Sequence, residues 1–202
     1  RMLYEAGGVL LGKLATHEFA HGGPSFDLPW PPARNPWHLE HFTGGSSSGS
    51  GAAVAAGLAP FAMGSDTTGS VRLPAAACGL VGVILPQGRV SGDGILPNCY
   101  SLDVPGPLTW TVEDAARVLD VLARPRISYA RTLSRPISGM RIGILRGPLG
   151  RFPAPDAAMT SGATAFWSRF APRARTPRFS RTAWKTPNEA ASALRMMTSA
   201  PR

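Results

Sequence analysis

Helical and strand-like segments alternate along the first 146 residues of this 202-residue chain, and the sequence therefore predicts an α/β fold. Three segments carry the prediction. Residues 8–14 (GVLLGKL) have the composition of a short buried strand, residues 111–123 (TVEDAARVLDVLA) have the periodicity of an amphipathic helix, and residues 140–145 (MRIGIL) again have strand character. Hydrophobic residues make up 44% of the chain, which is enough to build a core.

A long loop and several short elements are predicted between the first strand and the long helix. Residues 21–42 are predicted to form a loop, because a glycine pair and repeated prolines forbid a regular element there. The small apolar residues 52–58 predict a buried helix, and residues 60–64 predict a short strand. Residues 74–80 predict a second helix with a proline in its first turn, and residues 81–85 are β-prone.

The helix at residues 111–123 has the clearest signals in the chain. Thr111 is a good N-cap, and Asp114 stands three positions later, close to a capping-box arrangement. The apolar side chains predicted to share one face are Val112, Ala115, Val118, Leu119 and Leu122.

Charge is distributed unevenly along the chain. Residues 1–123 carry six basic and ten acidic residues, a net charge of −4, whereas residues 124–202 carry fifteen basic and two acidic residues, a net charge of +13. Two cysteines do not make a disulfide framework, and neither a leader-like segment nor a long apolar run is present. We therefore expect a cytoplasmic protein without membrane contact. For Cys78 we expect a buried structural role, with a reactive thiol as the alternative.

Residues 44–74 (GGSSSGSGAAVAAGLAPFAMGSDTTGSVRLP) hold two serine clusters separated by a small apolar segment. Glycine and serine are poor choices for the interior of a helix or strand, so the composition indicates tight backbone geometry around a site. A serine nucleophile needs a base and backbone N–H donors for the oxyanion. Residues 66–70 can supply a nucleophile and donors, and Ser46 could relay a proton to Ser70. The alternative is a flexible Gly/Ser linker.

The same residues resemble the signature of the amidase signature family, whose members hydrolyse or transfer amides. The matching positions are Gly44, Gly45, Ser46, Ser47, Gly49, Gly64, Asp66, Gly69, Ser70, Val71, Arg72 and Pro74. Ser46 and Ser70 are 24 residues apart, as the family's two catalytic serines are. The resemblance covers roughly residues 5–123 and returns at residues 140–146.

This resemblance implies the fold and the roles of the site residues. The fold would be part of the amidase signature fold, a mixed twisted β-sheet flanked by helices. Ser70 would be the acyl-enzyme nucleophile, and Ser46 would be a bridging serine that follows a cis peptide bond from Gly45. A neutral, desolvated lysine would act as the base through Ser46. The oxyanion hole would be the N–H groups of Thr67, Thr68 and Gly69, and the supporting residues would be Gly45, Ser47, Asp66 and Arg72.

Two departures from the family pattern stand out. The catalytic lysine has no counterpart in this sequence, because Lys13 matches a different, non-catalytic lysine and is a weak candidate for the base. A histidine base is the alternative, and the four histidines are His17, His21, His38 and His41. Thr68 stands where the family has a glycine, which would strain the loop if that position needed a positive φ.

We therefore expect hydrolysis of a carbon–nitrogen bond in a small-molecule amide, without cofactor or metal. The alternatives are the A subunit of an amidotransferase, which hydrolyses glutamine and acts with partner subunits, and a catalytically inactive truncated remnant. Residues 1–146 are predicted to form a partial amidase domain. Residues 147–202 are predicted to be a poorly matching basic segment, disordered or frame-shifted. We do not expect this segment to bind nucleic acid, and a homodimer stays open.

Overall fold

The computed structural model describes residues 1–23, 27–136 and 138. The chain divides into two compact units, residues 1–133 and 134–202, and every element named below belongs to the first unit. The strand predicted at residues 140–145 and the domain boundary predicted after residue 146 lie outside the described residues.

Three antiparallel strands form the sheet of the first unit, in the order β1–β3–β2. They are β1 (Phe61–Asp66), β2 (Val81–Gly82) and β3 (Val104–Thr109). In the register of the longer pair, Phe61 faces Thr109 and Asp66 faces Val104. Both pairings among the described strands are antiparallel, so the mixed sheet implied by the resemblance is not seen in this part of the chain.

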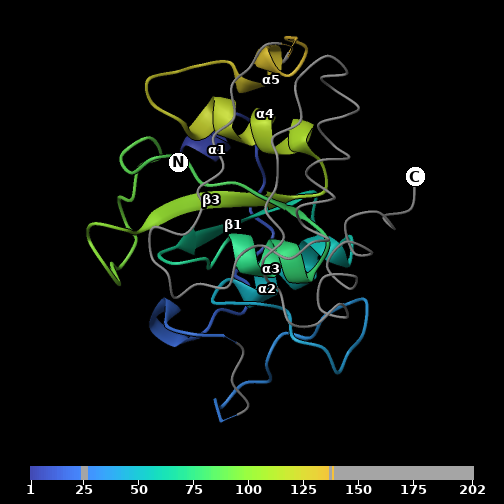
Figure 1. The fold of residues 1–202 in the computed structure, drawn as a ribbon. Coiled ribbons are helices and arrows are strands. Elements are labelled where there is room, and N and C mark those ends of the chain that lie inside the picture. The colour runs from blue at the N-terminus through green and yellow to red at the C-terminus, as the bar shows by residue number, and fades with distance from the viewer. Residues whose placement is uncertain (24–26, 137, 139–202) are drawn as a thin grey trace, which may run out of the picture. The chain divides into compact units, whose positions relative to one another are not determined.

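Helices cover both faces of this sheet, as Figure 1 shows, and the predicted α/β class is confirmed. On one face lie α2 (Ser48–Ala55) and α3 (Arg72–Ala77), and on the other lies α4 (Val112–Leu122). The shorter helices are α1 (Met2–Glu5), the 3-10 turn η1 (Glu18–Ala20) and α5 (Tyr129–Thr132). One buried cluster contains Val71, Ala75 and Leu108, and another contains Val90, Val118, Leu119 and Leu122.

Helix α4 forms as its sequence predicts. The Thr111 hydroxyl accepts a hydrogen bond from the Asp114 N–H at 3.1 Å, which satisfies one of the free amides of the first turn. Four of the five side chains predicted on the apolar face are buried, and Val112 is the exception. Val112 occupies the first helical position and is 57% exposed.

Strand β3 is not predicted by its sequence, VPGPLT, which contains two prolines that cannot donate to a sheet. The structure shows how they are accommodated. Val83 N–H donates to Pro107 O at 3.2 Å, so the backbone groups of Pro107, and of Pro105 two residues earlier, face the β2 side. Strand β2 pairs only with Leu108 and Thr109. The N–H groups that the two prolines lack would therefore have faced the β2 side of β3, where only Leu108 and Thr109 are paired.

The strand predicted at residues 8–14 is wrong. No helix or strand forms there, and Val9, Leu10 and Leu11 are 82%, 67% and 73% exposed. An isolated extended segment gains stability only from a neighbouring strand, and none of the described strands pairs with it.

The two predicted helices exist but begin earlier than expected. Helix α2 begins at Ser48 rather than residue 52, because the serine-glycine stretch itself forms the first turn. Helix α3 begins at Arg72, which places Pro74 within its first turn. The β-prone segment at residues 81–85 forms a strand only at Val81–Gly82.

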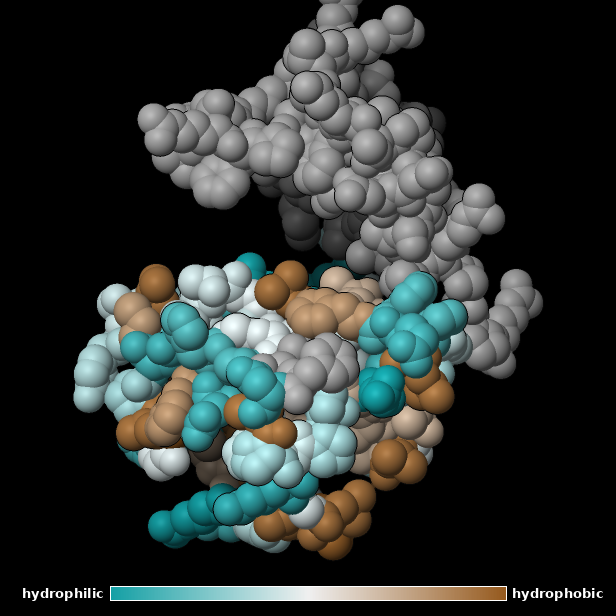
Figure 2. Space-filling model, turned by 90° about the horizontal axis from the view of Figure 1, so that it is seen from below, coloured by the Kyte–Doolittle hydropathy of each residue, from teal (hydrophilic) through white to brown (hydrophobic). Residues whose placement is uncertain are grey.

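Large apolar side chains are also exposed outside residues 8–14. Among the described residues of 18–23 and 27–42 they are Phe19, Trp30, Trp37, Leu39 and Phe42. Figure 2 shows hydrophobic side chains reaching the surface at several separate places among polar ones. In the part of the chain that the structure describes, no helix has both the length and the apolar character needed to cross a membrane.

Candidate active site

Ser46 lies in the first serine loop, which we define as residues 43–47. A cis peptide bond joins Gly45 to Ser46, as the sequence resemblance implies. Ser46 is fully buried, and its carbonyl accepts a hydrogen bond from the His17 N–H at 3.0 Å. Its Oγ has no hydrogen-bond partner among the described residues. A buried hydroxyl without a partner is uncommon, because it loses its hydrogen bonds to water on burial.

The first turn of α2 holds this loop against the extended segment before it. Gly49 N–H donates to Ala15 O at 2.8 Å, and Ser48 Oγ donates to the same oxygen at 3.4 Å. A Cβ added at Gly49 would lie 2.5 Å from Ala15 N and 2.6 Å from Ala15 O. Only glycine allows this approach of two backbones.

Ser47 joins the two serine clusters. Its N–H donates to Ser70 O at 3.3 Å, so the backbone of the first loop bonds directly to the residue predicted as nucleophile. Its Oγ donates to Ser65 O at 3.4 Å and accepts from Ser65 N–H at 3.3 Å. The two loops are therefore tied to each other and to the end of β1.

Asp66, the last residue of β1, organises the second serine loop, which we define as residues 66–71. Its carboxylate is fully buried. Oδ1 accepts from Gly69 N–H at 2.7 Å and from Arg72 Nη2 at 2.9 Å. Oδ2 accepts from Val71 N–H at 3.1 Å, Arg72 N–H at 3.3 Å and Arg72 Nε at 3.0 Å. One carboxylate thus closes the turn and begins α3.

These bonds change which amides are available for an oxyanion. Gly69 N–H donates to Asp66 in this structure, and the oxyanion role expected for it from the sequence stays a prediction. The N–H groups of Thr67, Thr68 and Ser70 have no acceptor within residues 1–23, 27–136 and 138. Gly69 has a φ of +144°, whereas Thr68 does not have a positive φ. The threonine is therefore accommodated without the strain considered from the sequence.

A second carboxylate, that of Asp103, holds the other side of this loop. Asp103 Oδ1 accepts from Thr67 Oγ1 at 2.6 Å. Asp103 Oδ2 accepts from Asn98 N–H at 2.7 Å and from Cys99 N–H at 2.8 Å. The sequence offers a signal for this residue, since Asp103 directly precedes a segment that pairs with β1, but the prolines conceal that strand.

Both carboxylates are kept ionised by their donors. Burial alone would raise the pKa of Asp66, but the hydrogen bonds from the Arg72 side chain and from the amides of Val71 and Arg72 outweigh it and lower the pKa. Burial likewise opposes ionisation of Asp103, and the bonds from Thr67, Cys99 and Asn98 lower its pKa. The bond to Asp66 raises the pKa of Arg72, whose side chain is half exposed.

In the described part of the chain, no lysine or histidine side chain is hydrogen-bonded to Ser46 or Ser70. Ser70 is 9% exposed, and its Oγ has no hydrogen bond to a described residue, so the relay expected between Ser46 and Ser70 is not formed here. Lys13 is exposed. The rings of His38 and His41 stack on each other with centroids 4.1 Å apart, and both residues are exposed.

Cys78 is a buried thiol beside the first serine loop. Burial raises the pKa of this thiol to about 11, and its sulfur donates to Thr43 O at 3.6 Å. No group of three metal-ligating side chains occurs among the described residues.

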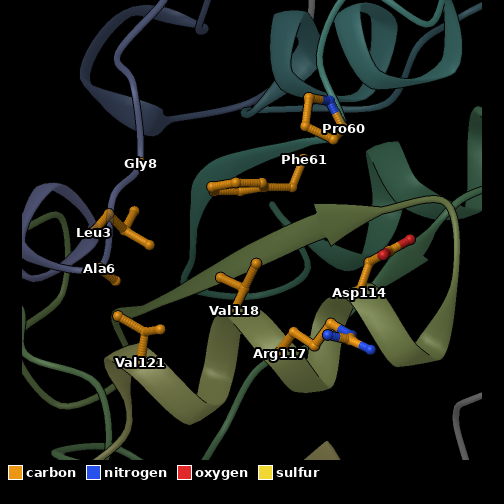
Figure 3. Close-up of a pocket in the computed structure, with 9 residues that line it drawn as sticks. All are labelled: Leu3, Ala6, Gly8, Pro60, Phe61, Asp114, Arg117, Val118 and Val121. Atoms are coloured by element: carbon orange, nitrogen blue, oxygen red, sulfur yellow. The ribbon is translucent and has the colours of Figure 1, made fainter.

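A mainly apolar pocket of about 260 Å³ opens between α1, the start of β1 and α4 (Figure 3). Phe61 and Val118 line it, with Asp114 and Arg117 at its α4 side. Phe61 and Asp66 stand at opposite ends of β1, about 17 Å apart at the usual rise of a strand. The pocket is therefore separate from the serine loops.

Comparison with known proteins identifies the family. The family model described as Amidase matches residues 1–155, more than half of the chain. The chain belongs to the amidase family. The A subunit of glutamyl-tRNA(Gln) amidotransferase from Moorella thermoacetica is 44% identical over 169 residues, covering 78% of this chain and 35% of that protein. The chain thus spans about a third of the length of the curated amidase-family relatives it matches.

Solved structures of the amidase family support the same assignment. The structure of 6-aminohexanoate cyclic dimer hydrolase complexed with substrate is 36% identical with a TM-score of 0.74, over 83% of this chain and 39% of that chain. The peptide amidase PAM in complex with the competitive inhibitor chymostatin is 36% identical with a TM-score of 0.70, over 85% of this chain and 39% of that chain. The amidase signature fold predicted from the sequence is confirmed.

Proposed function

We propose that this chain carries the nucleophile-bearing part of an amidase that hydrolyses the carbon–nitrogen bond of a small-molecule amide. The observation that carries the proposal is the position of Ser70. It lies at the end of a loop whose Thr67 and Thr68 N–H groups have no acceptor among the described residues, and Ser47 N–H in the first serine loop donates to its carbonyl oxygen. Membership of the amidase family supports the reaction class.

In the proposed mechanism Ser70 Oγ attacks the amide carbonyl and forms an acyl-enzyme. Its proton passes to Ser46 Oγ and from there to the neutral lysine that the family resemblance implies, which returns it through Ser46 to the leaving nitrogen as the C–N bond breaks. Water then hydrolyses the ester. The buried Ser46 hydroxyl supports this role, because its lack of a partner leaves it able both to accept and to donate. The lysine is not among the residues that contact Ser46 in the described structure.

For the oxyanion we propose the N–H groups of Thr67 and Thr68, as predicted from the sequence, together with that of Ser70. These donors have no acceptor among the described residues, whereas that of Gly69 is bonded to Asp66. Backbone donors fixed before the reaction stabilise the developing negative charge without reorganisation. Gly45, Ser47, Asp66 and Arg72 remain supporting residues in this proposal, since their contacts shape the two loops.

A fluorophosphonate probe tests this function directly. We expect the probe to form an adduct on the peptide that contains Ser70, identified by mass spectrometry. Ser70→Ala should abolish the adduct, and Ser91→Ala, which changes an exposed serine outside both loops and the turn at residues 98–103, should not. Labelling that persists in Ser70→Ala would contradict the proposal. Labelling lost in His41→Ala would favour the histidine base instead.

The relatives' names favour one more specific candidate, the ammonia-releasing component of an amidotransferase. These relatives are A subunits of glutamyl-tRNA(Gln) amidotransferases, at 44% to 46% identity. In that case the substrate would be glutamine, and ammonia would pass to another protein of the complex. Ammonia release from glutamine but not from simple aliphatic amides would support this candidate. Absence of labelling and of ammonia release would support an inactive remnant.

A further inference from the structure

We propose that Asp103 is a positioning residue that fixes the oxyanion side of the second serine loop through Thr67. The inference rests on the proposed function, since it assigns the loop's free amides to the oxyanion. Asp103 touches no reacting atom in this account. It acts on the direction in which the Thr67 and Thr68 N–H groups point.

The two oxygens of Asp103 have separate partners. Oδ1 accepts from the Thr67 hydroxyl at 2.6 Å, and Oδ2 accepts from the N–H groups of Asn98 and Cys99. Bonds to a charged acceptor are shorter and stronger than neutral ones. The turn at residues 98–103 therefore anchors the carboxylate, and the carboxylate anchors Thr67.

Strand pairing explains why Asp103 reaches this loop. Asp66 and Val104 face each other in the register of β1 and β3, and the next residues outward are Thr67 and Asp103. One position beyond the last backbone pair, the side chains of Thr67 and Asp103 are joined by a hydrogen bond. Strand pairing thus places a carboxylate from outside the serine clusters beside the second serine loop.

No other hydrogen bond to a described residue holds the Thr67 side of the loop. Asp66 binds the amides of Gly69, Val71 and Arg72, all on the later side of the loop. Thr67 and Thr68 have no backbone acceptor among the described residues. Without Asp103, the two residues between the Asp66 and Gly69 anchors would be held only by their chain neighbours.

The test uses the full chain and a small set of variants. Asp103→Asn weakens the acceptor and Thr67→Val removes the hydroxyl at similar volume. Each should slow fluorophosphonate labelling of Ser70 about tenfold, the scale of losing one charge-assisted hydrogen bond. The double variant should be no slower than either single one, because both remove the same contact. Thr67→Ser, which keeps the hydroxyl, should restore the wild-type rate. Asp93→Asn, a matched charge change at an exposed site, should have no effect.

Amide hydrogen exchange provides a readout that does not need labelling. In Asp103→Asn and Thr67→Val, we expect the hydrogen-bonded amides of the same loop, Gly69 and Val71 N–H, to exchange at least tenfold faster because the loop opens more often, with the amides of α4 unchanged and the Thr67→Ser protein like wild type. Unchanged exchange at these two amides, or slowing of labelling by Thr67→Ser equal to that by Thr67→Val, would overturn the inference. If the wild-type protein is not labelled at all, the proposed function fails, while exchange still decides the role of Asp103.

Discussion

The two serine loops are held in place by different kinds of hydrogen-bond acceptor. The first serine loop is fixed by backbone contacts, through the hydrogen bond from His17 N–H to Ser46 O and through the adjoining first turn of α2, where Gly49 N–H donates to Ala15 O. The second serine loop is fixed by two carboxylates, Asp66 within the loop and Asp103 directly before the neighbouring strand β3. Both loops carry a serine that the proposed mechanism needs.

This difference has consequences for how each loop responds to change. Backbone contacts depend on volume, so the first loop should be sensitive to added atoms and insensitive to pH. Carboxylates depend on ionisation and on their donors, so the second loop should be sensitive to acid and to side-chain removal. Four measurements test this contrast.

Removal of the Asp66 carboxylate should have the largest effect. Asp66→Ala leaves two loop amides and the first amide of α3 without an acceptor and separates the Arg72 side chain from its partner, and we expect a loss of about 3 kcal/mol in the free energy of unfolding. Urea unfolding followed by circular dichroism measures it. Asp93→Ala, at an exposed aspartate, is the control and should be neutral. Equal stability of the two variants would show that the carboxylate does not organise the loop.

Added volume in the first turn of α2 should come next. Gly49→Ala favours the helix by its intrinsic propensity, but the new Cβ would meet the Ala15 backbone at 2.5 Å, so we expect a net loss of about 2 kcal/mol. Gly12→Ala is the matched control, because nothing lies within 4 Å of its added Cβ. Thermal unfolding of the two variants compares them. A stabilised Gly49→Ala protein would mean that the two backbones are not in contact.

Acid should loosen the second loop before the first. The folded-state pKa values of Asp66 and Asp103 are lowered, so their contribution is complete above the unfolded pKa of about 4 and is lost as pH falls through the lower folded values. We expect the free energy of unfolding to decline below about pH 5. The decline should be shallower in Asp103→Asn and unchanged in Asp93→Asn. A pH-independent free energy would contradict the contrast.

The reactivity of the two cysteines gives the mildest test. Cys78 is buried, its pKa is raised to about 11, and its sulfur contacts Thr43 O in the first loop. We expect a thiol reagent at about pH 8 to modify Cys99 in the folded protein and Cys78 only after opening of the first loop. Gly49→Ala should speed modification of Cys78, and Asp103→Asn should not. Modification of Cys78 before Cys99, or faster modification of Cys78 in Asp103→Asn than in Gly49→Ala, would contradict this prediction.

Sequence patterns predict the elements whose signals are local. The α4 helix is specified by its own cap at Thr111 and its own apolar face, and β1 by a short apolar run, so neither needs a distant residue. Strand β3 and the segment at residues 8–14 differ from expectation for one reason. Whether an extended segment becomes a strand depends on a neighbour, and the neighbour is not visible in the segment itself. Pro105 and Pro107 argue against a strand until the partner on each side is known.

The site divides in the same way. The pair Ser46 and Ser70, their spacing and the family can be read from the sequence, because these depend on residue identity at fixed positions along the chain. Which amides of the second loop are free and which are bonded becomes visible only in the folded chain. The Gly69 amide is bonded because the Asp66 carboxylate turns back onto it, and the Thr67 hydroxyl is bonded because Asp103 lies beside it at the end of the β1–β3 pair. A hydrogen-bond donor can be assigned only when its acceptor is located, and here one of the acceptors directly precedes the neighbouring strand.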